Sequence, residues 1–467
     1  MSERESGFQQ FHEKMASENI SDIAIENFKH YYQKLCKGET GLIFEKEIEP
    51  VDSLPDIESL ASPELEDAGK QKMDRAVIIK LNGGLGTSMG MQKAKSLLTI
   101  KNDLSFLDII VRQAEHLDGS VPVVFMNSFS TRSDTLDALK KYESFAKRTL
   151  PADFLQNKVL KVNADDLSPV DWPECHELEW CPPGHGDIYT ALLTSGMLDR
   201  LLENGYEYAF VSNSDNLGAV LDPAILGYFV KNELSFMMET ADRTESDKKG
   251  GHLAKLTSGR YVLREIAQCP DEDMSSFQDI SRHKYFNTNN IWFHLPSLKS
   301  VLDRSKGVME LPMIRNRKNV DPRDPESTEV YQLETAMGAA IRVFDNAGAI
   351  RVPRSRFAPV KDTNDLLAVR SDCYVVNDYF QVVPNPDRKA GKITINLDPS
   401  YYKLIDDFES RFPFGAPSLV ACESLTVTGD FVFGRKVIMK GRVKLINNNR
   451  QVFKIKDAEQ IHGEFEV

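Results

Sequence analysis

The sequence is poor in cysteine, in basic residues and in long apolar runs, and each shortage excludes a class of protein. Only six cysteines occur among 467 residues, and none forms a Cys-x-x-Cys pair, which argues against a disulfide framework or a structural zinc site. No apolar run approaches the ~20 residues that cross a bilayer, and the polar N-terminus lacks the apolar centre of a signal peptide. We therefore expect a cytoplasmic protein with reduced thiols and no membrane partner.

Positive charge is also scarce, since 57 Lys and Arg stand against 70 Asp and Glu and the formal net charge is -13. Proteins that bind nucleic acid usually grip its phosphates with basic surface, so we expect no nucleic-acid partner. A small anionic substrate is compatible with this balance because it needs only a few local cations. The composition, 41% hydrophobic and 27% charged, is that of an ordinary globular protein.

The length suggests two or three domains, and residues 1–70 predict a helical segment followed by a linker. Ile25, Phe28, Tyr32 and Leu35 recur at helical spacing, with Gly38 at the position of a C-cap. The stretch from residue 52 to residue 71 is acidic, interrupted by proline and without a clear period, which is typical of a linker.

Residues 71–380 alternate between β-rich runs and helical patterns and are interpreted as the catalytic domain. Strands are predicted within 76–81, 121–126, 206–212, 234–240 and 289–293, and helices within 105–117 and 187–205. This alternation predicts an α/β fold: a Rossmann-like, mixed but mostly parallel sheet with helices on both faces. Ligands of such sheets gather at the carboxyl ends of the strands, where the connecting loops meet.

Residues 381–467 show short apolar alternations interrupted by Gly429, Gly434 and Gly441. This pattern predicts a small C-terminal β-solenoid, resembling a left-handed β-helix. A pair of hairpins fits the same pattern nearly as well. The segment could form the surface of a homo-oligomer or a module coupled to a lid, and the sequence does not discriminate between them.

A glycine-rich stretch, "LNGGLGTSMG", directly follows the first predicted strand and leads to Lys95 and Ser96. The dinucleotide fingerprint requires a glycine where Met89 stands, and the P-loop requires one where Ala94 stands, so both motifs fail on spacing. A glycine-rich turn without a ligand is the alternative. Four glycines in residues 83–90, followed by two lysines, favour a phosphate-binding loop of a third design.

The loop resembles the signature of the UTP–glucose-1-phosphate uridylyltransferases, also called UDP-glucose pyrophosphorylases. The resemblance continues, in family order, through "PPGHGDIY", "SNSDNLGA", "KGGHL", "FNTNNIW", "LETAMGAAI" and "SRFAPVKDTNDLL". These motifs cover roughly residues 80–367. The resemblance implies reversible uridylyl transfer: a phosphate oxygen of glucose 1-phosphate attacks the α-phosphorus of UTP in line, giving UDP-glucose and pyrophosphate with the help of Mg²⁺.

The resemblance assigns most of the nucleotide site to the glycine loop and to the motif after the strand near residue 210. The implied nucleotide contacts are Leu81, Asn82, Gly83, Gly84, Lys95, Gln156, Gly184, Asn213, Ser214, Asp215 and Lys361. Lys95 is expected on the triphosphate and Lys361 at the transferring phosphate, and both are interpreted as catalytic. Gly184 and Gln156 are expected beside the uracil.

Asp215 is the expected Mg²⁺ ligand, because a carboxylate at a strand's carboxyl end suits a hard cation that prefers oxygen. Judged from the residues alone, a helix N-cap or an Asx-turn explains Asp215 equally well. The resemblance places His185, Gly251, Glu265, Asn287 and Asn289 on the sugar phosphate. We expect His185 to bind without transferring a proton, because the attacking phosphate is already ionised.

Three other functions are alternatives to glucose-specific uridylyl transfer. A uridylyltransferase for galactose, N-acetylhexosamine or several sugar 1-phosphates is the nearest, but such relatives usually carry glutamine and arginine where this chain has Leu85 and Ser88. A nucleotide-binding sensor without turnover would not need Lys95, Asp215 and Lys361 together. A dehydrogenase fails on the glycine spacing.

Overall fold

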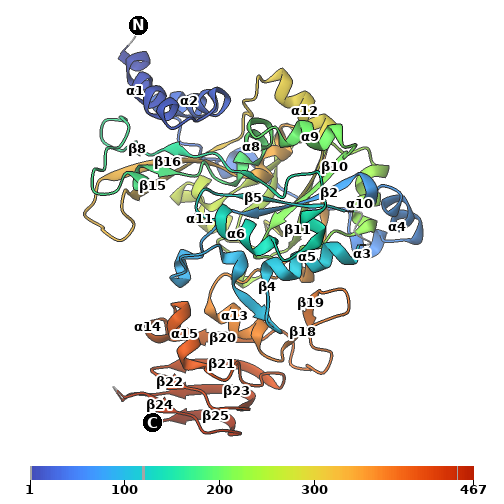
Figure 1. Cartoon of the computed structure of the whole chain (residues 1–467), viewed down its shortest axis with the longest axis vertical. Helices are drawn as coiled ribbons and strands as arrows, with labels where there is room; N and C mark the ends of the chain where they lie inside the picture. The colour runs from blue at the N-terminus through green and yellow to red at the C-terminus, as the bar shows by residue number, and fades with distance from the viewer. Residues whose placement is uncertain (1–2, 118–120, 450) are drawn as a thin grey trace.

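The computed structural model describes residues 3–117, 121–449 and 451–467 and is built around a mixed sheet of ten strands (Figure 1). The main path of the sheet runs β1-β12-β14-β10-β2-β5-β6, with β11, β13 and β17 attached to it. These strands are β1 (Ile48–Pro50), β2 (Ala76–Asn82), β5 (Val123–Asn127), β6 (Asp153–Leu155), β10 (Tyr208–Asn213), β11 (Phe236–Asp242), β12 (His252–Leu256), β13 (Tyr261–Arg264), β14 (Tyr285–His294) and β17 (Ala347–Arg351).

The centre of the sheet is parallel and its flank is antiparallel. Strands β10, β2, β5 and β6 run parallel to one another, whereas β14 is antiparallel to both β10 and β11. The expectation of a mostly parallel sheet therefore holds for the centre but not for the β12–β14 side. A short turn that contains Gly259 joins β12 to β13, and a turn of this length connects only antiparallel strands.

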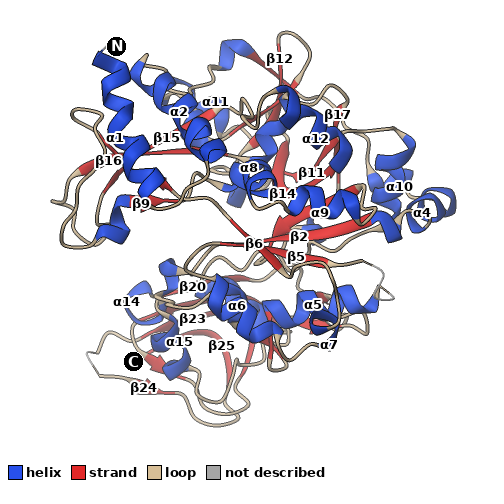
Figure 2. Cartoon of the chain, turned by 45° about the horizontal axis from the view of Figure 1, so that its top comes forward, coloured by secondary structure: helices blue, strands red, loops and turns tan. Residues whose placement is uncertain are grey.

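Helices cover both faces of the sheet, as the alternating pattern predicted (Figure 2). Along β2, Val77, Ile79 and Leu81 pack into one core with α8 (Ile188–Thr194), α9 (Met197–Glu203) and α12 (Leu295–Arg304). Ala76 and Ile78 point to the opposite face and pack with α5 (Phe106–His116) and α10 (Pro223–Lys231). The remaining helices of the catalytic region are α6 (Arg132–Leu139), α7 (Glu143–Ala146), α11 (Met274–Phe277) and α13 (Thr363–Arg370).

The N-terminal helix pair covers the smaller strands at one end of the molecule (Figure 1). The predicted helix is α2 (Asp22–Cys36), which ends just before Gly38, and α1 (Glu3–Ser17) precedes it. Phe28 and Tyr32 of α2 pack with Phe11 of α1. The strands beneath are β7 (Val159–Leu160), β8 (Val162–Asn163), β9 (Trp180–Cys181), β15 (Met313–Asn319) and β16 (Glu329–Thr335).

The expected linker between residues 52 and 71 is instead ordered and packed. It contains α3 (Ile57–Leu60) and α4 (Pro63–Lys70), and β1 just before it joins the central sheet. Ser62 caps α4 by accepting a hydrogen bond from the backbone N–H of Leu65. Helix α4 lies against α10 so closely that Gly69 and Gly227 face each other across the contact.

We expect Gly69→Ala to loosen this helix contact. A Cβ at residue 69 would lie 1.8 Å from the carbonyl oxygen of Pro223, so the two helices must separate. Overpacking of this kind lowers the free energy of unfolding by about 1–3 kcal/mol, which urea denaturation would measure. Asp67→Ala, an exposed position on the same helix, is the control and should change stability by only a few tenths of a kcal/mol. Equal stability of the two variants would contradict the close packing.

The C-terminal strands pair in parallel, which excludes the pair of hairpins. Strands β20 (Thr394–Leu397), β21 (Cys422–Thr428), β23 (Ile438–Ile446) and β25 (Gln460–Glu466) form one parallel sheet, and β22 (Phe431–Val432) pairs in parallel with β24 (Phe453–Lys454). Helices α14 (Pro399–Tyr402) and α15 (Ile405–Arg411) precede β21, and the short pairs β3 (Thr99–Lys101) with β4 (Leu104–Ser105) and β18 (Tyr374–Val376) with β19 (Val382–Pro384) lie nearby. The apolar core of this region continues to Met89, Leu98 and Phe106, behind the glycine-rich loop.

Within the described ranges, no helix is both long enough and apolar enough to span a bilayer. The six cysteines all lie in these ranges and are all free thiols.

Candidate active site

Two loops that carry predicted site residues leave neighbouring parallel strands at the same edge of the sheet. In the register of β10 and β2, Asn213 lies opposite Leu81, and the backbone N–H of Ser214 donates to the carbonyl of Leu81 (3.0 Å). We call residues 83–98 the glycine loop and residues 214–222 the Asp215 loop. The carboxyl ends of β2 and β10 therefore bring the two motifs together, as expected for an α/β sheet.

The glycine loop folds back toward the strand from which it starts. Gly86 and Gly90 have φ angles of 69° and 72°, a left-handed conformation that favours glycine, and they flank a single 3₁₀ turn with Met89 buried beneath it. The backbone N–H of Lys95 then donates to the carbonyl of Gly84 (3.1 Å). This closure returns Lys95 to the strand end, which explains why its spacing fits neither of the two standard motifs.

Lys95 and Asp215 form an ion pair between the two loops. The Lys95 Nζ lies 2.7 Å from the Asp215 Oδ2, and their side chains are 14% and 25% exposed. A partly exposed carboxylate that already attracts a cation fits a hard divalent ion, since such ions are typically held by one or two carboxylates together with substrate phosphates. The donor set at Asp215 is therefore compatible with a divalent metal bound with nucleotide.

Lys361 lies on a third loop, residues 353–362, which we call the Lys361 loop. The backbone N–H of Val360 donates to the carbonyl of Asp215 (3.2 Å), so Lys361 follows directly after the residue that touches the Asp215 loop. Its side chain is exposed, and its Nζ lies 5.7 Å from the centroid of the Phe357 ring. No carboxylate within the described ranges forms an ion pair with this ammonium, so its charge is available to an anion.

Gln156 and Gly184, the expected uracil residues, contact each other beside the glycine loop. The Gln156 Nε2 donates to the carbonyl of Gly184 (3.0 Å), and its Oε1 lies 2.9 Å from where a Cβ on Gly83 would be. Gly184 has a φ of 77°, and a Cβ there would lie 2.5 Å from the carbonyl oxygen of Thr335. Only glycine satisfies both constraints at this position.

His185 is held as a neutral hydrogen-bond donor. Its Nδ1 accepts from the backbone N–H of Met337 (3.0 Å), so the ring hydrogen resides on Nε2. Burial lowers the pKa of His185 to about 4, which keeps the imidazole neutral at physiological pH. This arrangement supports a binding role and gives no indication of proton transfer.

Four of the five residues expected on the sugar phosphate, all except His185, converge at the junction of β12, β13 and β14. The Glu265 carboxyl lies 2.5 Å from where a Cβ on Gly251 would be, and the backbone N–H of Asn287 donates to the carbonyl of Gly251 (3.0 Å). Asn289, with a φ of 57°, exchanges hydrogen bonds with the Asn287 amide. Burial raises the pKa of Glu265 to about 7, although the neighbouring Asn287 amide lowers it in part.

The two halves of the site are linked by a 3₁₀ segment, Met337–Arg342, for which no role was predicted. The backbone N–H of Met337 donates to His185, and a Cβ on Gly338 would lie 3.3 Å from the Asn287 Nδ2. The segment thus borders both the His185 turn and the sugar residues. Its first five residues, "MGAAI", lie inside a family motif, but small apolar residues carry no chemical signal that would have assigned the role.

Two of the expected nucleotide residues have side chains that face the interior. The Asn82 amide donates to Asn127 and Thr135 and is 1% exposed, and Leu81 packs in the main core. Asn82 lies on the strand face that meets α6, so its side chain holds the strands together. Only the backbone of Leu81 and Asn82 is placed to approach a nucleotide.

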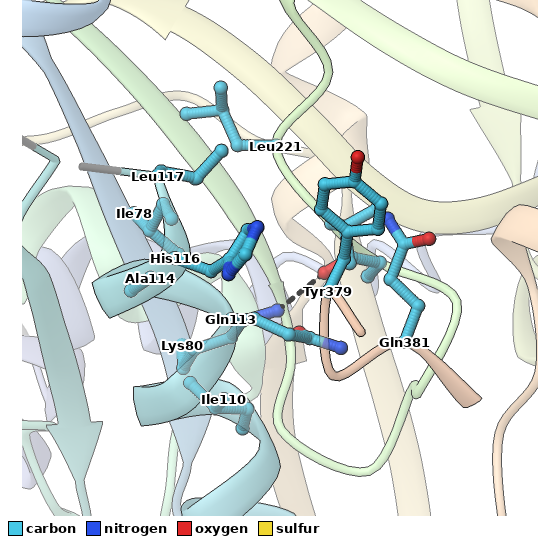
Figure 3. Close-up of a pocket in the computed structure, with 12 residues that line it drawn as sticks. Ile78, Lys80, Ile110, Gln113, Ala114, His116, Leu117, Leu221, Tyr379 and Gln381 are labelled. Atoms are coloured by element: carbon cyan, nitrogen blue, oxygen red, sulfur yellow. Dashed lines mark hydrogen bonds between the residues drawn. The ribbon is translucent and has the colours of Figure 1, made fainter. Parts of the chain in front are cut away.

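Two other features lie outside this constellation. A small cavity of about 60 Å³ lies between α5 and the turn at Tyr379 (Figure 3), with Ile78, Gln113, His116 and Gln381 among its lining residues. No predicted site residue lines it. Asp171, His176 and Glu179 also cluster, but the buried Glu179 already pairs with Lys14 and His176.

Comparison with known proteins gives a consistent result. A family model described as UTP–glucose-1-phosphate uridylyltransferase matches residues 25–440. A probable UTP–glucose-1-phosphate uridylyltransferase of Schizosaccharomyces pombe is 43% identical over 379 residues, covering 80% of this chain and 73% of that protein. A variant of UDP-glucose pyrophosphorylase from Leishmania major superposes with a TM-score of 0.90 at 42% identity, covering 100% and 99% of the two chains. Another variant of that protein, in complex with UDP-glucose, gives a TM-score of 0.89 at 42% identity and 99% coverage of both chains.

Proposed function

The chain belongs to the UTP–glucose-1-phosphate uridylyltransferase family, and on that premise we propose how its residues carry out the reaction. The enzyme transfers the uridylyl group of UTP to glucose 1-phosphate and forms UDP-glucose and pyrophosphate. One observation carries the residue assignment: Lys95, Asp215 and the Lys361 loop meet at the ends of β2 and β10.

The reaction requires two polyanions to meet. A phosphate oxygen of glucose 1-phosphate forms a bond to the α-phosphorus of UTP while the bond to the bridging oxygen of pyrophosphate breaks in line. Because the attacking phosphate is already ionised, no residue has to remove a proton. The protein therefore acts by positioning the two substrates and by neutralising their charge.

We assign the roles of the two lysines by their positions. Lys95 leaves its ion pair with Asp215 and contacts the triphosphate, while the backbone of Leu81 to Gly84 approaches the nucleotide. Lys361, whose ammonium is exposed, contacts the phosphate that is transferred. Gln156 and Gly184 bind the uracil, and this assignment is supported by their mutual hydrogen bond beside Gly83. Asn213 and Ser214 complete the nucleotide site at the end of β10.

Asp215 would hold a magnesium ion together with the bound nucleotide. When bound, Mg²⁺ supplies positive charge to the phosphates between which the transfer takes place. The proposal is supported by the oxygen donor at Asp215 and by the ion pair that this carboxylate already makes. Before the metal binds, Lys95 keeps the carboxylate neutralised.

The sugar phosphate is proposed to lie along His185, Gly251, Glu265, Asn287 and Asn289. His185 donates its Nε2 hydrogen toward a phosphate oxygen. Glu265 and the two asparagines offer the carboxylate and amide groups that recognise sugar hydroxyls. Gly251 leaves room for the Glu265 carboxyl, which a side chain at this position would displace.

We expect Glu265→Gln to lower kcat/KM for glucose 1-phosphate by a factor that increases with pH. The pKa of Glu265 is raised to about 7, so its carboxylate forms, and accepts hydroxyl hydrogens, only as the pH increases through that value. Loss of hydrogen bonds to a charged group lowers kcat/KM for glucose 1-phosphate by about 10–100-fold above pH 7 and by less below it. Steady-state pH profiles of both proteins measure this difference.

The substrate phosphate also titrates, so the informative quantity is the ratio of wild-type to variant kcat/KM at each pH. Glu272→Gln, at an exposed position in the 3₁₀ turn Asp271–Asp273, is the control and should leave the ratio at one. A wild-type to Glu265→Gln ratio that stays constant between about pH 6 and pH 8 contradicts the assignment.

A substrate panel tests the choice of sugar. With UTP and Mg²⁺, we expect glucose 1-phosphate to be used with the highest kcat/KM, and galactose 1-phosphate and N-acetylglucosamine 1-phosphate with much lower values. Leu85 and Ser88 in the glycine loop support this preference. Equal use of several sugar 1-phosphates would favour the broader uridylyltransferase.

We also propose the division into residues 1–70, 71–380 and 381–467, with the C-terminal part a short β-solenoid. The parallel strands support the solenoid, although the shared apolar core shows that this part also supports the glycine loop. Strand β25 ends its sheet and is a candidate surface for a second copy, which gel filtration with light scattering would test. The cytoplasmic location expected from the sequence stays a prediction.

A further inference from the structure

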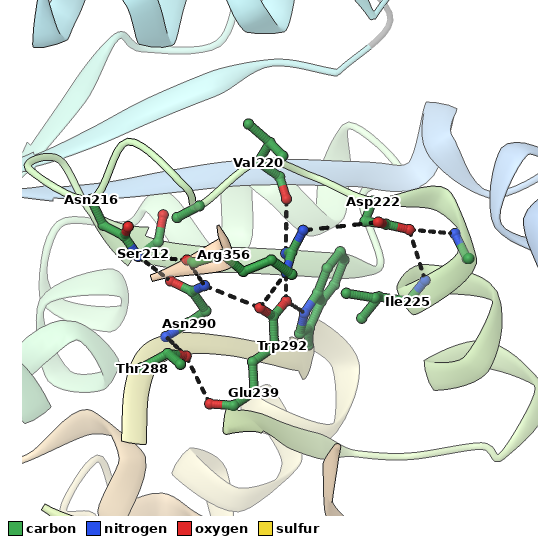
Figure 4. Close-up of polar contacts among 12 residues, drawn as sticks. Ser212, Asn216, Val220, Asp222, Ile225, Glu239, Thr288, Asn290, Trp292 and Arg356 are labelled. Atoms are coloured by element: carbon green, nitrogen blue, oxygen red, sulfur yellow. Dashed lines mark hydrogen bonds and ion pairs between the residues drawn. The ribbon is translucent and has the colours of Figure 1, made fainter. Parts of the chain in front are cut away.

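A buried ion pair lies beneath the proposed active site and is not part of it. The Glu239 carboxylate on β11 is fully buried and accepts from the Nε and Nη2 of Arg356, each at 2.7 Å. It also accepts from the Trp292 Nε1 (2.9 Å) and the Asn290 Nδ2 (3.0 Å), both on β14 (Figure 4). Each oxygen of this carboxylate thus accepts two hydrogen bonds, from Arg356 and from β14. A buried charge is stable only when it is paired and hydrogen-bonded in this way.

Arg356 connects this pair to the Asp215 loop. Its Nη2 also donates to the carbonyl of Val220 (2.9 Å), and its own carbonyl accepts from the Asn216 Nδ2 (3.1 Å). The Asn216 Oδ1 in turn accepts from the backbone N–H of Ala358 (2.9 Å) and of Gly218 (3.1 Å). Asn216 is therefore bonded to both loops at once (Figure 4).

The two loops run side by side in a fixed register. Asn216 and Pro359 form an antiparallel bridge, Leu217 donates to Ala358, and Val360 donates to Asp215. A Cβ at Gly218 would lie 2.2 Å from the carbonyl of Ser355, so the approach is as close as glycine allows. Asp215 and Lys361 are at the far end of this paired stretch, and their separation depends on its register.

We propose that Arg356 and Asn216 are positioning residues, which set the distance between the Asp215 carboxylate and the Lys361 ammonium by locking the two loops onto Glu239. The inference rests on the proposed roles of Asp215 and Lys361. Neither positioning residue touches substrate. Both are 5–6% exposed, and their side-chain hydrogen bonds go to loop backbone, to Glu239 and to Asn290.

A bidentate arginine is needed here because one side chain has to bind two partners in one plane. Lysine would keep the charge but could not bind both carboxylate oxygens and the Val220 carbonyl with the same geometry. Glu239 anchors the pair to a central strand, so a small shift at Arg356 is transmitted along the Lys361 loop. A misplacement of about 1 Å in a site of this kind can cost about 10²-fold in rate.

The test uses Arg356→Lys and Asn216→Ala, with Arg388→Lys as the matched control. Arg388 also bonds several backbone carbonyls, but in the C-terminal region away from the site. We expect both test variants to lower kcat by about 10²-fold with KM for UTP changed less than about threefold, and to raise the Mg²⁺ concentration for half-maximal rate. The control should change neither kcat nor the Mg²⁺ dependence.

Thermal stability is measured alongside the kinetics, because buried polar substitutions also destabilise. Asn216→Ala leaves every buried charge paired, so it stays informative if Arg356→Lys does not fold. A lower melting temperature in both test variants with kcat within about twofold of the wild type would overturn the positioning role. A wild type that releases no pyrophosphate would contradict the proposed function instead, so the two failures are distinct.

Discussion

Lys361→Ala should lower turnover by about 10³-fold while UTP affinity changes by less than about threefold. The reason is the location of this ammonium: it is exposed, has no carboxylate partner among the described residues and follows the residue bonded to Asp215. A cation that contacts the transferred phosphate stabilises charge mainly in the transition state, so its loss lowers kcat more than it weakens ground-state binding.

Single-turnover rates and UTP binding by calorimetry separate these two effects for Lys361→Ala. Lys93→Ala is the control, because Lys93 is an exposed lysine near the same site and has no assigned contact. Its turnover should stay within about twofold of the wild type. Losses of similar size in UTP affinity and in turnover for Lys361→Ala contradict the assignment of this lysine to the transferred phosphate.

Asp215→Ala should abolish Mg²⁺-dependent activity, a loss of at least about 10³-fold. Asp215 is the proposed oxygen ligand at the junction of the three loops, and its replacement also leaves Lys95 without its partner. The rate should then no longer respond to Mg²⁺, because the proposed oxygen ligand is gone. A titration of the initial rate with Mg²⁺ at saturating UTP measures this response.

Asp199→Ala is the matched control for Asp215, since Asp199 is an exposed aspartate on α9, away from the three loops. It should show the wild-type Mg²⁺ response. If Asp215→Ala also retains that response, Asp215 is not the metal ligand. Mn²⁺ in place of Mg²⁺ provides a second readout, because binding of this ion can be followed by its magnetic resonance signal without turnover.

The central strands and the place of the glycine loop could be predicted because their physical signals are local. The run Ala76–Leu81, apolar except for Lys80, is buried throughout, as the parallel centre of an α/β sheet requires, and the glycine loop follows at its carboxyl end. The helical spacing of Phe28 and Tyr32 likewise located α2. The resemblance, and not the spacing, supplied Gln156, Glu265 and Asn287, since isolated polar residues have no periodic signal.

Errors came where tertiary contacts outweighed composition. The acidic stretch with Pro55 and Pro63 indicated a linker, yet Ser62 and Pro63 are a helix start, and Gly69 allows α4 to pack on α10. The antiparallel flank of the sheet depends on the turn at Gly259 and on how β14 pairs with strands that are distant in sequence. Such strand pairings depend on the whole fold, so a short stretch of sequence does not predict them.

The directions of the side chains at the site could not be predicted from the sequence either. Asn82 precedes the glycines and is expected to present its backbone to the nucleotide. Its side-chain amide bonds to Asn127 and Thr135 inside the fold, a direction that the sequence does not show. Arg356 lies in the arginine-rich stretch "RVPRSRF", a composition typical of an exposed surface, yet it is 6% exposed and pairs with Glu239. Only the three-dimensional structure separates an arginine that faces water from one that anchors a loop.

Uridylyl transfer is tested most directly by measuring the pyrophosphate and UDP-glucose that the purified protein forms from UTP and glucose 1-phosphate with Mg²⁺. We predict that the two products form in equal amounts and that omitting any one of the three components stops their formation. Absence of pyrophosphate under all conditions, or pyrophosphate release that does not depend on glucose 1-phosphate, would contradict uridylyl transfer by this protein.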